Sequence, residues 1–153
     1  MEQKIIKTIT RITQDLLNRL QTQATVTVDQ EEETFNVRLE TEDAGVLIGY
    51  RGRSLQSLQT VLGQFIVKEL GEWKRIVLHV GDYRERREDY LNELASSVAQ
   101  EVIETGADVA IPDLSSYERR LVHMVLAEEH PEVISESEGM GKNRRLIVKK
   151  RAS

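Results

Sequence analysis

A short glycine-sided corner, "IGYRGRSL" at residues 48–55, holds the first side chains that could bind an anion. Gly49 and Gly52 allow a tight turn and a close approach to a ligand, because glycine has no Cβ. The helix expected after the corner exposes unpaired N–H groups and a partial positive charge, which attract anions. Arg51 and Arg53 can add charge-assisted hydrogen bonds. The corner suits a phosphate group, although an isolated G-x-x-G also fits an ordinary turn with solvated arginines.

A second candidate cluster lies in "YERRLVH", residues 117–123. Arg119 and His123 are four residues apart, a spacing that puts both on one face of a helix, and Arg120 adds a second cation. No Ser, Cys or paired carboxylate stands at a spacing that would activate a nucleophile, which favours binding over catalysis. A solvated polar face and a catalytic His123 are the alternatives. The opposite face is predicted to be core: Tyr117, Leu121, Met124 and Val125.

Charge is distributed unevenly along this chain, whose formal net charge is −5. Residues 29–43 hold seven acids and one base, whereas residues 142–151 hold six bases and no acid. Separate acidic and basic regions are compatible with a polyanion bound on one surface. Lys142, Arg144 and Arg145 are therefore further candidate contacts.

Two arginines upstream, Arg84 and Arg87 in "YRERRE", are also candidates for phosphate contacts. For Arg84 the alternative is an ion pair with Glu88 one turn later, which contributes only about 0.3–0.5 kcal/mol.

Composition excludes several classes of function. The absence of cysteine excludes disulfides and thiolate sites and is typical of a reducing cytoplasm. The three histidines, His79, His123 and His130, show no metal-ligand spacing, so neither a metal nor another cofactor is predicted. Polar residues interrupt the N-terminal stretch, and no apolar run reaches transmembrane length. We expect a cytoplasmic protein without an integral membrane segment.

Hydrophobic periodicity places the glycine corner between two predicted helices. Apolar residues at helical spacing follow the corner, with Ser54 as the expected N-cap of their helix: Leu55, Leu58, Leu62, Phe65 and Ile66. Strands are predicted where apolar and polar residues alternate. The elements expected through residue 81 are a helix ending near residue 20, strands 24–29 and 34–41, a short helix 42–49, helix 54–70 and strand 74–81.

A second unit is predicted to begin at residue 82, which gives domains 1–81 and 82–153. Ser115 and Glu118 fit the S-x-x-E capping box, in which side chains satisfy free backbone donors at a helix start. The expected elements are helix 82–106 ended by Gly106, a short extended segment 108–112, helix 115–130, and strands 132–137 and 144–150. The fold class is therefore α+β with two small domains.

The order of elements through residue 81, with its G-x-x-G between two helices, resembles a type II KH domain (helix-strand-strand-helix-helix-strand). In that family the loop clamps the backbone of a single strand, and about four nucleotides cross an adjacent groove. The resemblance implies nucleic-acid contacts from Gly49, Tyr50, Arg51, Gly52 and Arg53. Ile48, one of the apolar residues flanking the loop, is included in the predicted site.

Residues 82–153 resemble the R-x-x-x-H single-stranded nucleic-acid-binding domain (helix-strand-helix-strand-strand). The resemblance rests on Arg119 and His123, on "SEG" at residues 137–139 and on "NRR" at residues 143–145. A KH unit followed directly by this unit is similar to the bacterial Jag/KhpB family of RNA-binding proteins. Members commonly carry a further small N-terminal domain, whereas this sequence starts at the KH helix. The family also implies a separate KH-only protein partner.

These observations predict a non-enzymatic protein that binds single-stranded RNA, with single-stranded DNA as another ligand. Its expected role is post-transcriptional regulation or RNA chaperoning. The alternative is a protein-interaction or self-association module in which nucleic-acid binding is incidental. The net negative charge and the low aromatic content of 5% favour that alternative.

Overall fold

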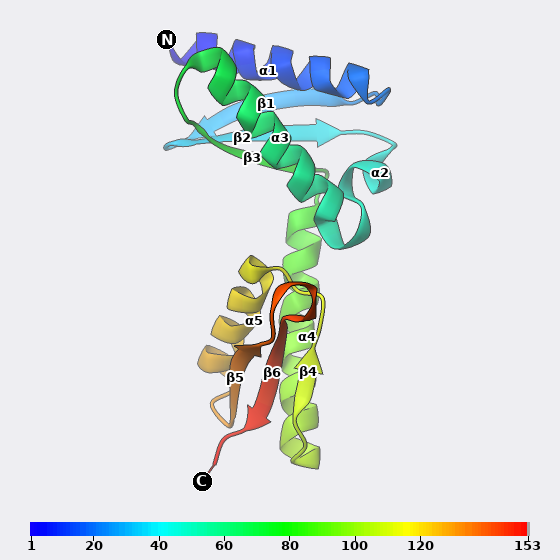
Figure 1. Ribbon diagram of the computed structural model, residues 1–153, viewed down its shortest axis with the longest axis vertical. Coiled ribbons are helices and arrows are strands. Elements are labelled where there is room, and N and C mark those ends of the chain that lie inside the picture. Colours follow the sequence, from blue (N-terminus) through cyan, green and yellow to red (C-terminus); the bar gives the residue numbers. More distant parts are fainter. Residues whose placement is uncertain (153) are drawn as a thin grey trace. The chain divides into compact units, whose positions relative to one another are not determined.

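The computed structural model describes residues 1–152 as two compact units, Met1–Arg84 and the chain from Glu85 onward. Each unit combines helices with a three-stranded sheet (Figure 1), which confirms the predicted α+β class. The division falls shortly after the predicted boundary at 81/82. The long helix α4 (Tyr83–Thr105) therefore contributes its first two residues to the first unit.

The first unit has the predicted order helix-strand-strand-helix-helix-strand. Its sheet has the order β1-β2-β3, with β1 and β2 antiparallel and β2 and β3 parallel. A parallel pair needs a crossover, and the helical segments between β2 and β3 supply it. The elements are α1 (Glu2–Arg19), β1 (Thr25–Glu31), β2 (Thr34–Glu40), α2 (Ala44–Ile48), the 3-10 turn η1 (Tyr50–Gly52), α3 (Arg53–Leu70) and β3 (Arg75–Val80).

Helices α1 and α3 cover one face of the first sheet (Figure 1). Because side chains alternate along a strand, every second residue of β2 and β3 points into the layer beneath these helices. Helix, strand and corner residues share this core: Ile9, Ile12, Leu17, Phe35, Val37, Leu39, Leu47, Ile48, Leu55, Leu62, Ile66, Ile76, Leu78 and Val80.

The other face of the first sheet carries a polar network across all three strands. Asp29 of β1 accepts hydrogen bonds from Asn36 Nδ2 at 3.2 Å and Arg38 Nε at 3.0 Å. The Oδ1 of Asn36 contacts Nε2 of His79 at 3.0 Å, which gives His79 the structural role expected of a strand histidine. Hydrogen bonds from Asn36 and Arg38 lower the pKa of the Asp29 carboxyl.

The second unit has the predicted order helix-strand-helix-strand-strand. Its antiparallel sheet has β6 in the centre, in the order β4-β6-β5. Helices α4 and α5 bury one face of that sheet around Leu91, Val102, Val122 and Leu146. After α4 the elements are β4 (Val109–Ile111), α5 (Ser116–Glu129), β5 (Val133–Glu138), the 3-10 turn η2 (Gly141–Asn143) and β6 (Arg145–Lys150).

The predicted N-cap of α3 is wrong. The helix starts at Arg53, one residue earlier than expected, and Gly52 occupies the cap position with no side-chain cap bond. The left-handed conformation of Gly52 (φ 78°, ψ 12°) lets the helix begin directly after the turn. Ser54 therefore lies inside the first turn.

Three residues assigned to apolar stripes are exposed instead of core. Tyr117, Met124 and Phe65 retain 64%, 49% and 48% of their surface. Each lies at the edge of its helix stripe, where the flanking sheet or helix does not reach. Periodicity alone cannot locate that edge.

Candidate nucleic-acid interfaces

The glycine corner, defined as residues 49–53, is built by an unusual run of backbone conformations. Gly49 ends α2 at φ 68° and ψ −171°, a region that only glycine occupies readily. Arg51 (φ 52°, ψ 32°) and Gly52 (φ 78°, ψ 12°) then adopt left-handed conformations. The chain reverses within these residues and leads straight into α3, whose free N–H groups open toward the corner.

Close neighbours leave no room for a side chain at either glycine. A Cβ on Gly49 would overlap the Ser54 side chain, with its Cβ only 2.7 Å away. A Cβ on Gly52 would lie 2.9 Å from the hydroxyl oxygen of Tyr83. Tyr83, the first residue of α4, therefore packs beneath the corner, a role that the sequence did not reveal.

The side chains of the corner form an exposed cationic and aromatic group. Tyr50 is 59% exposed, and the guanidinium carbons of Arg51 and Arg53 lie 5.1 and 5.4 Å from its ring centroid. At these distances the ring and the two cations attract one another. The predicted residue Ile48 differs, because it is buried in the core and can only support the corner from within.

A second surface, called here the arginine depression, lies between α5 and the β5–β6 hairpin. It is an open hollow of about 470 Å³. Four predicted residues from two regions meet in it, although α5 and the start of β6 are far apart in sequence. Its lining residues are Ser116, Arg119, Arg120, His123, Ser135, Glu136, Ser137, Arg144 and Leu146.

Two of these arginines are held by backbone carbonyls. Arg119 donates from Nη1 to the carbonyl oxygen of Leu114 at 2.7 Å and from Nη2 to Ser116 Oγ at 3.1 Å. Arg144 donates from Nη1 to the carbonyl oxygen of Gly139 at 2.8 Å, across the hairpin turn. Each guanidinium has five N–H donors, so these bonds leave donors for an anion.

His123 is oriented by a serine that reasoning from sequence patterns did not select. Its Nδ1 lies 2.6 Å from Ser135 Oγ in β5. The other ring nitrogen, Nε2, is the one through which this exposed imidazole can meet a ligand. A hydrogen bond at one ring nitrogen sets which proton the other carries, so Ser135 is part of the site.

The structure does not bring every predicted residue into the depression. Lys142 in η2 and Arg145 at the start of β6 are absent from its lining within residues 1–152. Arg145 is paired with Glu138 of β5 and follows Arg144 directly. Because it alternates with the buried Leu146, it lies on the outer face of the sheet.

Arg84 and Arg87 make contacts inside their own units. Arg84 donates from Nε to the carbonyl oxygen of Leu78 at 3.0 Å and from Nη2 to Gln59 Oε1 at 2.8 Å. Arg87 forms an ion pair with Glu118, with Nε 3.0 Å from Oε1. Both side chains are half-buried, unlike the exposed arginines of the glycine corner.

Neither a membrane span nor a metal centre is present in the described part of the chain. No helix within residues 1–152 is long and apolar enough to cross a bilayer. The same residues contain no group of three His, Cys, Asp or Glu side chains that could hold a metal ion.

Comparison with known proteins assigns each unit to a domain family. Residues 6–80 match the KH domain of KhpA/KhpB, and residues 89–150 match the R-x-x-x-H domain. Both are families of binding domains and not of enzymes, in agreement with the expectation from the sequence.

Relatives match across both domains. Proteins named "RNA-binding protein KhpB" from Clostridium symbiosum, Lactiplantibacillus plantarum and Bacillus subtilis are 34%, 37% and 29% identical to this chain. The matches cover 80%, 82% and 80% of this chain but 55%, 38% and 60% of those relatives, so it spans about half their length. The chain thus carries a KH domain of the KhpA/KhpB family followed by an R-x-x-x-H domain.

Proposed function

We propose that this protein binds single-stranded RNA through both the glycine corner and the arginine depression. The observation that carries the proposal is the meeting of Arg119, Arg120, His123 and Arg144 in one open hollow of the R-x-x-x-H unit. Guanidinium groups bind phosphate oxygens through two parallel hydrogen bonds. The only acid lining the described hollow, Glu136, lies 2.9 Å from Lys149 Nζ, which offsets its charge.

The glycine corner supplies the second contact. Its backbone can approach a strand closely, and the start of α3 attracts a phosphate group. Arg51 and Arg53 can bind the flanking phosphates, while the exposed ring of Tyr50 offers a surface for one base. Two weak sites gain avidity when they bind one strand together.

The relatives and the domain families support RNA as the ligand. The relatives named above are called RNA-binding proteins, and both matched families are binding domains. Single-stranded DNA as a further ligand, a role in post-transcriptional regulation or RNA chaperoning, and a cytoplasmic location extend the proposal.

The test compares binding of a fluorescent mixed-sequence RNA to the intact chain and two double variants. Tyr50→Asp/Arg51→Asp changes the glycine corner, and Arg119→Ala/His123→Ala changes the arginine depression. Each is expected to lose affinity while its circular dichroism spectrum stays native. For about 4–6 phosphates neutralised, log K should fall with log salt at about −0.7 per phosphate. Affinity that is indifferent to salt and to both variants would overturn the proposal.

A protein-interaction role is the second candidate, and one surface of the KH unit favours it. Val61 and Phe65 lie one helical turn apart on α3 and remain 43% and 48% exposed. Apolar pairs of this kind occur at interfaces with another copy or with a KH-only partner. A Val61→Lys/Phe65→Lys variant should lower the sedimentation coefficient if the chain self-associates there. An unchanged monomer would count against self-association through α3.

A further inference from the structure

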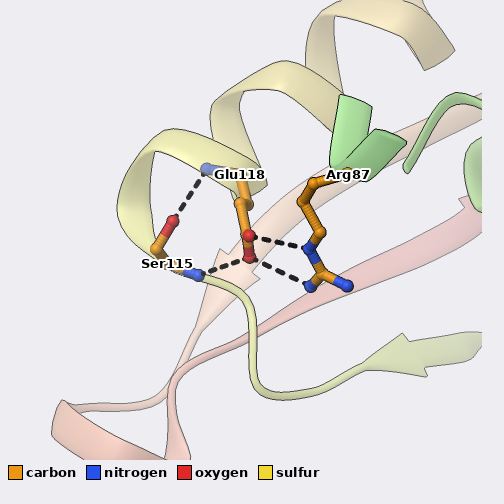
Figure 2. Close-up of polar contacts among 3 residues, drawn as sticks. All are labelled: Arg87, Ser115 and Glu118. Atoms are coloured by element: carbon orange, nitrogen blue, oxygen red, sulfur yellow. Dashed lines mark hydrogen bonds and ion pairs between the residues drawn. The ribbon is translucent and has the colours of Figure 1, made fainter. Parts of the chain in front are cut away.

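Glu118, in the first turn of α5, connects three parts of the R-x-x-x-H unit (Figure 2). Its carboxylate accepts hydrogen bonds from Arg87 of α4, with Nε 3.0 Å from Oε1 and Nη2 3.4 Å from Oε2. Oε2 also accepts the backbone N–H of Ser115 at 3.2 Å, and the Glu118 N–H donates to Ser115 Oγ at 3.1 Å. One carboxylate therefore closes the capping box and joins the start of α5 to α4.

The pair of Arg87 and Glu118 is shielded from water. Their side chains are 16% and 12% exposed, whereas the other ion pairs around Arg11, Arg38 and Lys149 have at least one partner that is more than 40% exposed. A shielded carboxylate that loses its cation must move toward water or take up a proton. The conformation of the first turn of α5 therefore depends on Arg87.

The same turn holds the first cation of the arginine depression. Arg119 directly follows Glu118, and its guanidinium is bound to the carbonyl oxygen of Leu114 and to Ser116 Oγ. These two residues flank Ser115, which Glu118 holds at both its N–H and its hydroxyl. A shift of the capping turn would therefore move the Arg119 guanidinium and the ligand donors on it.

We propose that Arg87 and Glu118 are positioning residues that set the ligand affinity of the arginine depression without touching the ligand. This inference rests on the proposed function, because the affinity concerned is that for single-stranded RNA. It gives Arg87 a different role from the direct phosphate contact that the sequence suggested. The buried acid Glu118 thereby supports binding of a polyanion.

The first experiment measures RNA affinity for the full chain and four single variants. Arg87→Gln removes the shielded cation, and the exposed neighbour Arg86→Gln is the control with the same change in charge. Arg87→Gln is expected to weaken binding about tenfold, as loss of a supporting contact does at other preorganised sites. Arg86→Gln should weaken it about twofold or less, as is typical for a surface charge.

Two further variants separate positioning from direct contact. Arg87→Lys would keep nearly full affinity if residue 87 bound phosphate, because an ammonium group also binds phosphate. As a positioning residue it should lose affinity, because an ammonium group cannot span both carboxylate oxygens. Glu118→Gln removes a negative charge, so simple electrostatics predicts tighter RNA binding, whereas lost positioning predicts weaker binding. Full affinity in Arg87→Lys, or tighter binding in Glu118→Gln, overturns the inference.

A second readout uses the protein without RNA and so separates this inference from the proposed function. In ¹H–¹⁵N NMR spectra, Arg87→Gln should shift the Nε–Hε signal of Arg119 and the backbone signals of residues 115–119, and Arg86→Gln should leave them in place. If no variant binds RNA but these signals shift, the proposed function fails and the coupling stands. Unmoved signals overturn the coupling. If Arg87→Gln does not fold, Arg87→Lys and Glu118→Gln give both readouts.

Discussion

The glycine corner and the arginine depression offer cations to a ligand by different means. In the corner the backbone is decisive: Gly49 and Gly52 adopt conformations that place α3 immediately after a reversal, and the arginines beside them are exposed. In the depression the backbone is ordinary helix and hairpin. Hydrogen bonds of Arg119, His123 and Arg144 set the geometry there.

The difference predicts how each surface fails. A backbone-built site is sensitive to any side chain added at its glycines but tolerant of changes in its exposed side chains one at a time. A site built from side chains is sensitive to loss of a partner atom, even one that never touches the ligand. Glycine substitutions and hydroxyl deletions therefore probe the two surfaces separately.

The largest effect is expected for Gly49→Ala. Its backbone lies in a glycine-only region, which costs about 1–3 kcal/mol for another residue, and the new Cβ would overlap Ser54. The variant should lose that much unfolding free energy in urea and also lose RNA affinity. Gly45→Ala is the matched control, because a Cβ there meets no atom within 4 Å. It should be neutral or stabilising by up to about 1 kcal/mol. Equal stabilities of the two variants would show that the corner is not strained as described.

A smaller effect is expected for Ser135→Ala in the arginine depression. The variant removes the hydroxyl that holds His123 Nδ1, a bond of about 0.5–1.5 kcal/mol, and should weaken RNA binding a few-fold at unchanged stability. Ser96→Ala removes a similar contact, with His130 Nε2 at 3.2 Å, outside the depression. Fluorescence anisotropy should show lower affinity for the first variant and wild-type affinity for the second. The reverse order would remove Ser135 from the site.

The smallest effect concerns Asp29, which lies outside both surfaces. Its pKa is lowered in the folded state by hydrogen bonds from Asn36 and Arg38. A carboxyl with a lowered pKa stabilises the fold above its unfolded pKa, and that stability is lost as the pH falls through the folded value. Stability should therefore decline below about pH 4 more steeply in the wild type than in Asp29→Asn. Because the side chain is 45% exposed, solvent screening keeps the difference small. Parallel pH profiles from chemical denaturation would contradict this assignment.

Local patterns in the sequence predicted the elements and several site residues well. The order of helices and strands in both units was correct, because periodicity of 2 or 3.6 residues reports which faces are buried. The capping box of Ser115 and Glu118 was also correct, since both partners lie within one turn. Arg119 and His123 share a hollow as their spacing predicted.

What the sequence could not reveal depends on contacts between distant residues. Glu118 meets Arg87 across 31 residues, and Tyr83 packs against Gly52 from the next helix. Alternation along β6 allows only one of Arg144 and Arg145 to face the depression, but choosing between them requires knowing which face α5 covers. The start of α3 was misplaced because Gly52, and not a side chain, occupies its cap position.

RNA binding by the two surfaces is tested most directly by titrating the ¹⁵N-labelled chain with single-stranded RNA and following its amide signals. We expect the signals of residues 49–53 and of Arg119, Arg120, His123 and Arg144 to shift most, while those of the Asp29 network on the opposite sheet face stay in place. Shifts concentrated on that sheet face, or no shift at low salt, would contradict RNA binding at these surfaces.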